Sequence, residues 1–140
     1  MAARDYNSPM GNWNVRNVVN MSSIFNNAIA FNQPLNTWNI GNVSNMISVF
    51  QGAVAFNQPL DAWDVKKVIC MNCMFRGAIG FNQDINCWDV SHVEMMYSMF
   101  SNATGFNSPL DRWEVGKVHN VCGMFMGASS FNQPPRLNGG

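Results

Sequence analysis

Cysteine is the residue type whose spacing in this sequence could do chemistry. Cys70 and Cys73 form a Cys-x-x-Cys pair, and Cys87 and Cys122 bring the number of cysteines to four. This spacing is typical of a zinc-ligand pair or a redox-active pair, and two nearby thiols can also close a disulfide. Three interpretations are open at this point: a metal site, a Cys70–Cys73 disulfide, and four free thiols.

Histidine is the second residue type that could take part in chemistry. His92 and His119 occupy different places in the repeated pattern described below. That pattern suggests no Ser-His-Asp or Cys-His arrangement, and the sequence contains no glycine-rich phosphate loop. We therefore expect no catalytic, cofactor-binding or metal-binding residues and predict that the protein is not an enzyme.

A 25-residue repeat organises nearly all of the sequence. Successive tryptophans are 25 residues apart, and each unit opens with an aromatic residue and an asparagine. A proline two residues after the asparagine and an aliphatic residue before the tryptophan recur in most units. A strict period of roughly 20–50 residues is typical of stacked repeats. The tryptophans are Trp13, Trp38, Trp63, Trp88 and Trp113.

The second half of each unit has the spacing of an amphipathic helix. Val18, Met21, Ile24, Phe25 and Ala28 follow one another at intervals of 3, 3, 1 and 3, which would place them on one helix face. A small residue ends each unit, where a helix would stop. The sequence therefore predicts short helices over residues 18–28, 43–53, 68–78, 93–103 and 118–128.

The first half of each unit resembles a half-buried strand. Trp38 and Ile40 are apolar with a polar residue between them, and Pro34 would precede the strand, where a missing N–H costs little. Asn32 should satisfy backbone groups at a turn. The predicted fold is an α/β solenoid of five strand–helix coils, with a parallel sheet on one face, short helices on the other, and ladders of Trp, Phe, Met and Leu inside.

The repeat defines the expected domain organisation. We predict a leader over residues 1–5, a single solenoid domain over 6–134, and a flexible tail over 135–140. Neither end has the polar capping unit that repeat arrays need, so we expect the chain to be a piece of a longer array. The predicted units are 6–30, 31–55, 56–80, 81–105 and 106–130, with a partial unit at 131–134.

The repeat also bears on the cysteines. Cys70 stands where the preceding unit has Asn45, and Cys73 stands where it has Ser48, so both replace polar residues. Cys122 is two coils from Cys73, which is too far for a disulfide that needs Cα atoms within about 7 Å. We favour free thiols, which are typical of a reducing compartment, over a Cys70–Cys73 disulfide or a zinc site.

Composition excludes several kinds of partner. Only 11% of the residues are charged and the formal net charge is zero, so the sequence has no electrostatic footprint for nucleic acid. No apolar run approaches the roughly 18 residues of a membrane-spanning helix, and the N-terminus has no apolar signal core. We predict no nucleic-acid partner and no direct membrane insertion.

The segment from Phe31 to Met46, Phe-Asn-Gln-Pro-Leu-Asn-Thr-Trp-Asn-Ile-Gly-Asn-Val-Ser-Asn-Met, resembles the BspA-like repeats of bacterial surface proteins and lipoproteins. Its Leu-x-x-Trp-x-Val core resembles a leucine-rich repeat. The resemblance covers residues 6–134 and implies a leucine-rich-repeat-like solenoid with a role in adhesion or protein binding. It implies a cell-surface or extracellular location, but related repeats occur in protist and algal proteins, so the localisation stays open.

The outward position of the predicted strands is the candidate binding site. Parallel neighbours in a sheet are about 4.8 Å apart, so three consecutive acidic residues there would repel one another unless solvent, lysine, a cation or a basic partner offsets them. The candidate column is Asn14, Asn39, Asp64, Asp89 and Glu114, and the flanking candidates are Arg16, Lys66 and Arg112.

These observations predict a non-enzymatic repeat module without a cofactor. It would mediate protein–protein interaction or adhesion through its strand face, as part of a longer surface protein. The alternative is a structural scaffold or accessory subunit packed within a larger assembly. In either case the partner is a protein, and end-to-end stacking with further repeats is a second mode of contact.

Overall fold

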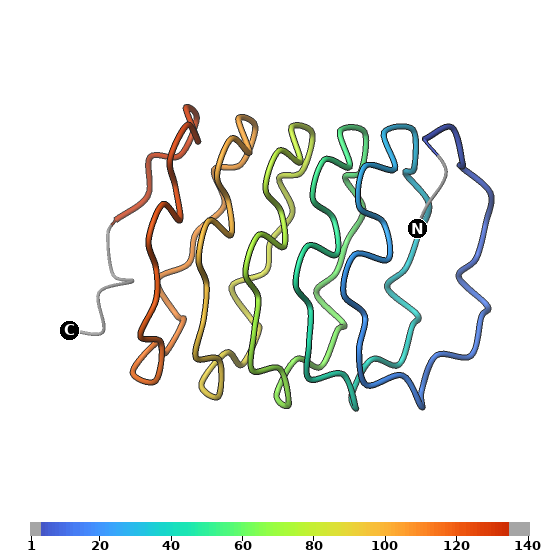
Figure 1. The fold of residues 1–140 in the computed structure, drawn as a ribbon, viewed down its shortest axis with the longest axis horizontal. Helices are drawn as coiled ribbons and strands as arrows, with labels where there is room; N and C mark the ends of the chain where they lie inside the picture. The colour runs from blue at the N-terminus through green and yellow to red at the C-terminus, as the bar shows by residue number, and fades with distance from the viewer. Residues whose placement is uncertain (1–3, 135–140) are drawn as a thin grey trace.

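The computed structural model describes residues 4–134 as a stack of 25-residue coils that follow one another along a single axis (Figure 1). This part of the chain contains no helix and no extended strand. It therefore has no helix long and apolar enough to cross a membrane. The predicted tail at 135–140 and most of the predicted leader at 1–5 lie outside the described residues. The regular pairing consists of single parallel bridges, Asn20 to Asn45, Asn45 to Cys70, Cys70 to Met95 and Met95 to Asn120.

The predicted α/β solenoid of strand–helix coils is wrong, and so are its five helices. The segments at 18–28, 43–53, 68–78, 93–103 and 118–128 are series of β-turns. In the first coil, the N–H of Ile24 donates to the carbonyl of Met21, and the N–H of Ala28 donates to that of Phe25. Bonds from residue i+3 to residue i bring every third side chain to the same side, so the apolar spacing of these turns resembles that of a helix.

Positive φ angles are the physical reason that these segments cannot be helical. Ser23 and Asn27 each have φ of 62°, whereas every residue of a helix has φ near −63°. Asn and Gly enter this left-handed region at the lowest cost. The position of Asn27 in each unit is occupied by Asn or Gly throughout, namely Asn27, Gly52, Gly77, Asn102 and Gly127, and that recurrence was the signal in the sequence against a helix.

Backbone hydrogen bonds of the turn segments run between coils. Met21 N donates to Asn45 O at 2.9 Å, and Phe25 N donates to Val49 O at 3.0 Å. The same offset of 24 residues applies to every second N–H of this segment in the later coils, as from Phe50 N to Met74 O. The backbone groups that an isolated turn would leave unpaired are thus satisfied by the next coil.

The predicted parallel sheet is also absent from the described residues. Between residues 4 and 134, no backbone–backbone hydrogen bond joins the first halves of neighbouring coils, and side chains join them instead. The amide N–H of Asn57 donates to the Oδ1 atom of Asn32 at 2.9 Å, and Gln58 Nε2 donates to the carbonyl of Asn32. The asparagine column therefore satisfies backbone groups as predicted, but it does so across coils.

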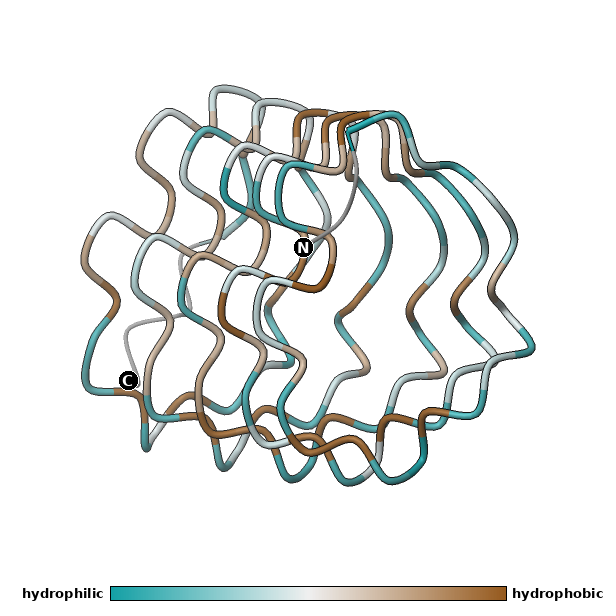
Figure 2. Ribbon diagram, turned by 45° about the vertical axis from the view of Figure 1, so that its right-hand side comes forward, coloured by the Kyte–Doolittle hydropathy of each residue, from teal (hydrophilic) through white to brown (hydrophobic). Residues whose placement is uncertain are grey.

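Aromatic ladders fill the inside of the stack, as the repeat predicts. Phe25, Phe50 and Phe75 stack with ring centroids 5.5–5.6 Å apart, and Phe50 is fully buried. Trp63 and Trp88 stack at 6.5 Å, so the coils are spaced more widely on the tryptophan side. Apolar segments recur at the same place in successive coils (Figure 2). This ladder core fixes the coils in register and so fixes the spacing of the side chains outside it.

Candidate functional site

The candidate column lies on the surface of the tryptophan side of the stack. Each of its residues follows a tryptophan directly in the sequence. Stacking of these tryptophans sets the distance between successive coils, with ring centroids 6.4–6.5 Å apart from Trp63 to Trp113. The chain bends through turns here, so the column is not part of a strand as we had predicted. All five side chains are exposed: Asn14, Asn39, Asp64, Asp89 and Glu114.

A local turn explains why Asn and Asp recur in this column. The Oδ1 atom of Asn39 accepts a hydrogen bond from the N–H of Gly41 at 3.1 Å, and Asp64 does the same for Lys66 at 3.1 Å. This contact between residue i and the N–H of residue i+2 is an Asx turn, which Asn and Asp form equally well. The turn therefore requires the side-chain oxygen but not the negative charge of Asp64.

The charge of the column is only partly offset. Lys66 Nζ lies 3.8 Å from Asp64 Oδ2, and both side chains are more than half exposed. Such a surface pair contributes about 0–1 kcal/mol. Between residues 4 and 134 it is the one ion pair within 4.0 Å, so Asp89 and Glu114 have no cationic partner there. Within the described residues, no backbone N–H donates to the Glu114 carboxylate as it does to those of Asp64 and Asp89.

Ser91 is a neighbour of the column that the sequence did not single out. Its hydroxyl donates to Asp89 Oδ1 at 2.6 Å, and its N–H donates to the same atom at 3.1 Å. These bonds hold the pKa of Asp89 below its ordinary value, with smaller contributions from the charges of His92 and Lys66. Asp89 is therefore a carboxylate at neutral pH, and the Asx spacing in the sequence could have indicated this contact.

The Asp89, Ser91 and His92 cluster does not have the geometry of nucleophilic catalysis. The Ser91 hydroxyl proton points to Asp89, and His92 Nδ1 is 3.4 Å from the Ser91 oxygen. An activated serine needs a histidine that accepts its proton and a carboxylate that orients that histidine. Here the serine stands between the two other groups, so the cluster stabilises a turn.

The two flanking arginines are far apart in the stack. Arg16 belongs to the first coil, where its carbonyl accepts a hydrogen bond from Asn42 Nδ2 at 2.7 Å. Arg112 belongs to the fifth coil, and its N–H donates to Asn86 Oδ1 at 3.0 Å. Both are exposed. The structure therefore places Lys66 beside the acidic part of the column, whereas Arg16 lies beside the uncharged Asn14 at the start of the column.

The four cysteines are free thiols in different surroundings. Cys70 is buried, Cys73 is half-buried, and Cys87 and Cys122 are exposed. Burial raises the pKa of Cys70, and burial together with the charge of Asp61 raises that of Cys87. Among the described residues, no three His, Cys, Asp or Glu side chains are arranged to hold a metal ion. The Cys-x-x-Cys spacing thus belongs to the turn segment of the third coil.

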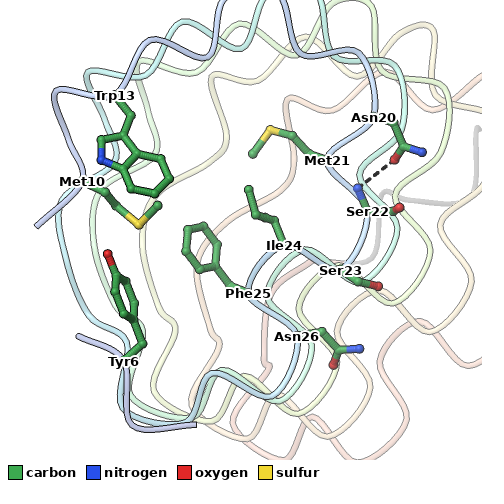
Figure 3. Close-up of a pocket in the computed structure, with 10 residues that line it drawn as sticks. All are labelled: Tyr6, Met10, Trp13, Asn20, Met21, Ser22, Ser23, Ile24, Phe25 and Asn26. Carbon is green, nitrogen blue, oxygen red and sulfur yellow. Dashed lines mark hydrogen bonds between the residues drawn. The ribbon is translucent and has the colours of Figure 1, made fainter. Parts of the chain in front are cut away.

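A hollow of about 830 Å³ opens at the N-terminal end of the stack (Figure 3). Tyr6, Met10 and Trp13 line one side of it, and Met21 and Phe25 line the other. The counterparts of these residues in the second coil are covered by neighbouring coils on both sides, whereas Trp13 is 55% exposed. The lining is the open face of the ladder core, and its Asn and Ser residues all come from the one turn segment between Asn20 and Asn26, so they do not converge from different sides as in a ligand pocket.

The fold and these surfaces define a tandem-repeat protein of stacked β-turn coils, with an exposed column of polar and acidic side chains. The sequence matches the family described as Mycoplasma protein of unknown function, DUF285, over residues 1–76 and again over 59–137. The chain belongs to this family. No curated protein and no solved structure matches the sequence.

Proposed function

We propose that the chain is a non-enzymatic repeat module that binds a protein partner through the acidic end of the exposed column. The observation that carries the proposal is the charge of Asp64, Asp89 and Glu114. The Asx turn operates with Asn14 and Asn39 in the first two coils, so it does not need this charge. Repelling carboxylates that a fold does not require are best explained by a basic partner.

The stack supports this proposal because it holds the three carboxylates in order. Stacked Trp63, Trp88 and Trp113 lie beneath them with ring centroids 6.4–6.5 Å apart. A ligand with basic side chains at a matching interval could contact all three coils at once. The resemblance to BspA-like repeats adds adhesion on a cell surface as the setting in which such binding would serve.

The test is to remove the charge and keep the turn. The variant Asp64→Asn/Asp89→Asn/Glu114→Gln keeps one side-chain oxygen at each position, which is the acceptor that the turn uses at Asp64 and Asp89. The matched control, Asp61→Asn/Asp84→Asn/Asp111→Asn, removes the same charge from other positions of the same three coils. Each protein is immobilised and used to capture partners from cell extract at low and physiological salt, since surface charge contacts weaken with salt.

A partner captured by the wild-type chain and the control, but lost with the column variant, is the expected result. Equal capture by all three proteins would rule out the column as the binding surface. The open hollow beside Trp13 favours the second candidate function, a structural scaffold packed within a larger assembly. In that case the three proteins would capture the same partners.

A further inference from the structure

We infer that copies of this chain join head to tail, with the last coil of one copy stacked on the first coil of the next. The inference starts from unpaired backbone groups at the two ends. Within residues 4–134, the carbonyls of Asn20, Ser22 and Ile24 receive no hydrogen bond, although their counterparts in each later coil accept one from the coil before. At the other end, the N–H groups of Val121, Gly123, Phe125 and Gly127 have no acceptor in the described structure.

The polarity of these rows determines which ends can meet. The N-terminal end presents a row of carbonyls and the C-terminal end presents a row of N–H groups with the same spacing. Two N-terminal ends would place acceptors against acceptors, whereas a C-terminal end on an N-terminal end restores the bonds found between all coils. Because the two contacting surfaces differ, the contact is heterologous, and because the coils follow a single axis it adds copies along that axis (Figure 1).

The tryptophan side offers a second pair of groups. In each of the later coils the indole N–H donates to a carbonyl 28 residues earlier, as Trp113 Nε1 does to Ile85 O at 2.9 Å. Trp13 Nε1 has no such acceptor between residues 4 and 134, and no indole reaches the carbonyl of Leu110 there. In the proposed joint, Trp13 of one copy donates to Leu110 of the other and its exposed ring becomes covered.

The side chains at the joint are compatible with stacking. Phe125 would meet Phe25, which continues a ladder whose rings are 5.6 Å apart inside the chain. Gly127 would meet Asn27, which repeats the succession of Gly77 and Asn102 in the third and fourth coils. Every described coil interface follows the same ladder, so the joint copies contacts that the fold already makes.

Charge is sparse at the N-terminal end that would be covered. The first unit carries one charged residue, Arg16, and Arg4 and Asp5 precede it, whereas the three units over residues 56–130 carry the acidic column and all three lysines. Depletion of charge is typical of the core of a protein interface. The buried Oδ1 atom of Asn26, at the same end, also has no hydrogen-bond partner.

One segment changes place in the joint. Phe131 stacks on Phe106 at 5.9 Å, and Asn132 donates to Asn107, so residues 131–134 already begin a sixth coil. Residues 6–9 of the next copy would occupy the same position. In the joint, residues 131–134 of one copy therefore replace residues 6–9 of the next copy at the start of the shared coil. That coil then continues at Met10 of the next copy.

The test uses the 140-residue chain and two blocked variants, each with a substitution that prevents stacking at one of the two ends. Trp13→Arg places a charge in the N-terminal face. Val121→Pro removes a terminal N–H that has no described partner, at a residue whose φ is not positive. Ala62→Arg is the control, because it adds the same charge at an exposed position of the third unit where the fifth unit has Arg112. Molar mass is measured by sedimentation and light scattering over a wide range of concentration.

The mass of the wild-type chain and of Ala62→Arg should rise steadily with concentration. Each blocked variant alone should remain a monomer, and an equimolar mixture of the two should reach the mass of a dimer and stop there. Circular dichroism checks that each variant is folded. If Val121→Pro is not, Phe125→Arg replaces it, because it places a charge on the ring position that would meet Phe25 of the next copy.

A wild-type chain that stays monomeric at every concentration would overturn the inference, and so would a dimer of Val121→Pro alone, which would show contact between like ends. Equal loss of assembly in Ala62→Arg would also contradict it, because the control leaves both ends intact. The inference does not depend on the acidic column. Failure of the column variant to lose a partner would therefore leave it standing.

Discussion

The indole N–H of Trp63 donates a hydrogen bond to the backbone carbonyl of Leu35 in the preceding coil, at 2.9 Å. The same bond joins Trp88 to Leu60 and Trp113 to Ile85. In the described part of the chain, no backbone–backbone hydrogen bonds link the coils on this side, so the tryptophans both fill the core and hold the coils together. The exposed column outside them depends on this contact for its spacing.

Trp63→Ala should lower the free energy of unfolding by about 3–5 kcal/mol, because it empties a large buried aromatic from the core. Trp63→Phe keeps most of the ring and loses only the bond to Leu35, so it should cost about 1 kcal/mol beyond the loss of ring size. Urea unfolding measures both. A change under about 1 kcal/mol for Trp63→Ala would mean that the side chain is not buried as described.

Three glycine variants should separate backbone strain from steric overlap. Gly116→Ala should be neutral, because its new Cβ atom meets nothing within 4 Å. Gly77→Ala meets only Gly52 at 3.8 Å but has φ of 69°, so it should cost about 1–2 kcal/mol. Gly52→Ala has similar strain and also overlaps Asn27 Oδ1, which should add about 1–3 kcal/mol.

The overlap can be tested in a second background. Replacing Asn27 with glycine removes the amide oxygen that the new methyl group would meet. In the Asn27→Gly background, Gly52→Ala should therefore cost no more than Gly77→Ala does, as measured by urea unfolding. Equal costs of Gly52→Ala in both backgrounds would show that Asn27 is not in contact with it.

The carboxyl of Asp89 should titrate below its ordinary pKa of 3.8, because the Ser91 hydroxyl and N–H stabilise the carboxylate. Since the pKa is lower in the folded chain, the stabilisation is present above the pKa of the unfolded chain and is lost as the pH falls through that of the folded chain. Carbon-detected NMR titration measures the pKa of Asp89 in the folded chain, and Ser91→Ala should raise this pKa. A pKa at or above the ordinary value would show that the Ser91 contact does not form in solution.

The four thiols should react with iodoacetamide at different rates. Reaction needs an accessible thiolate, so exposed Cys122 should be labelled early, whereas buried Cys70, whose pKa is raised by burial, should be labelled last. Mass spectrometry after timed labelling, without reductant, gives the order and the number of free thiols. Four labelled residues are expected, and a pair of Cys70 and Cys73 that resists labelling until reduced would indicate a disulfide.

The sequence was sufficient to predict the repeat, the buried positions and the exposed column, because all three follow from strict periodicity. It was misleading about local structure. Met21, Ile24 and Phe25 have helical spacing, but consecutive turns with bonds from residue i+3 to residue i give the same spacing. Asn27 and its counterparts, three of which are glycine, indicate left-handed residues within the expected helix, and such residues are incompatible with it.

The strand prediction failed for a different reason. Alternation around Trp38 and Ile40 identified the buried side chains correctly, but alternation does not tell which groups carry the hydrogen bonds. Between these coils the bonds come from tryptophan, asparagine and glutamine side chains. The contact of Ser91 with Asp89 was missed because it depends on the turn that follows the column.

Both proposals require backbone hydrogen bonds that run from coil to coil, and NMR can detect such a bond directly. Scalar coupling across the hydrogen bond should connect the amide nitrogen of Phe50 to the carbonyl carbon of Met74, because that N–H donates to the Met74 oxygen at 2.8 Å. A coupling from Phe50 to Met46 instead, four residues earlier, would mean that the segment is helical and would contradict the stack of β-turn coils.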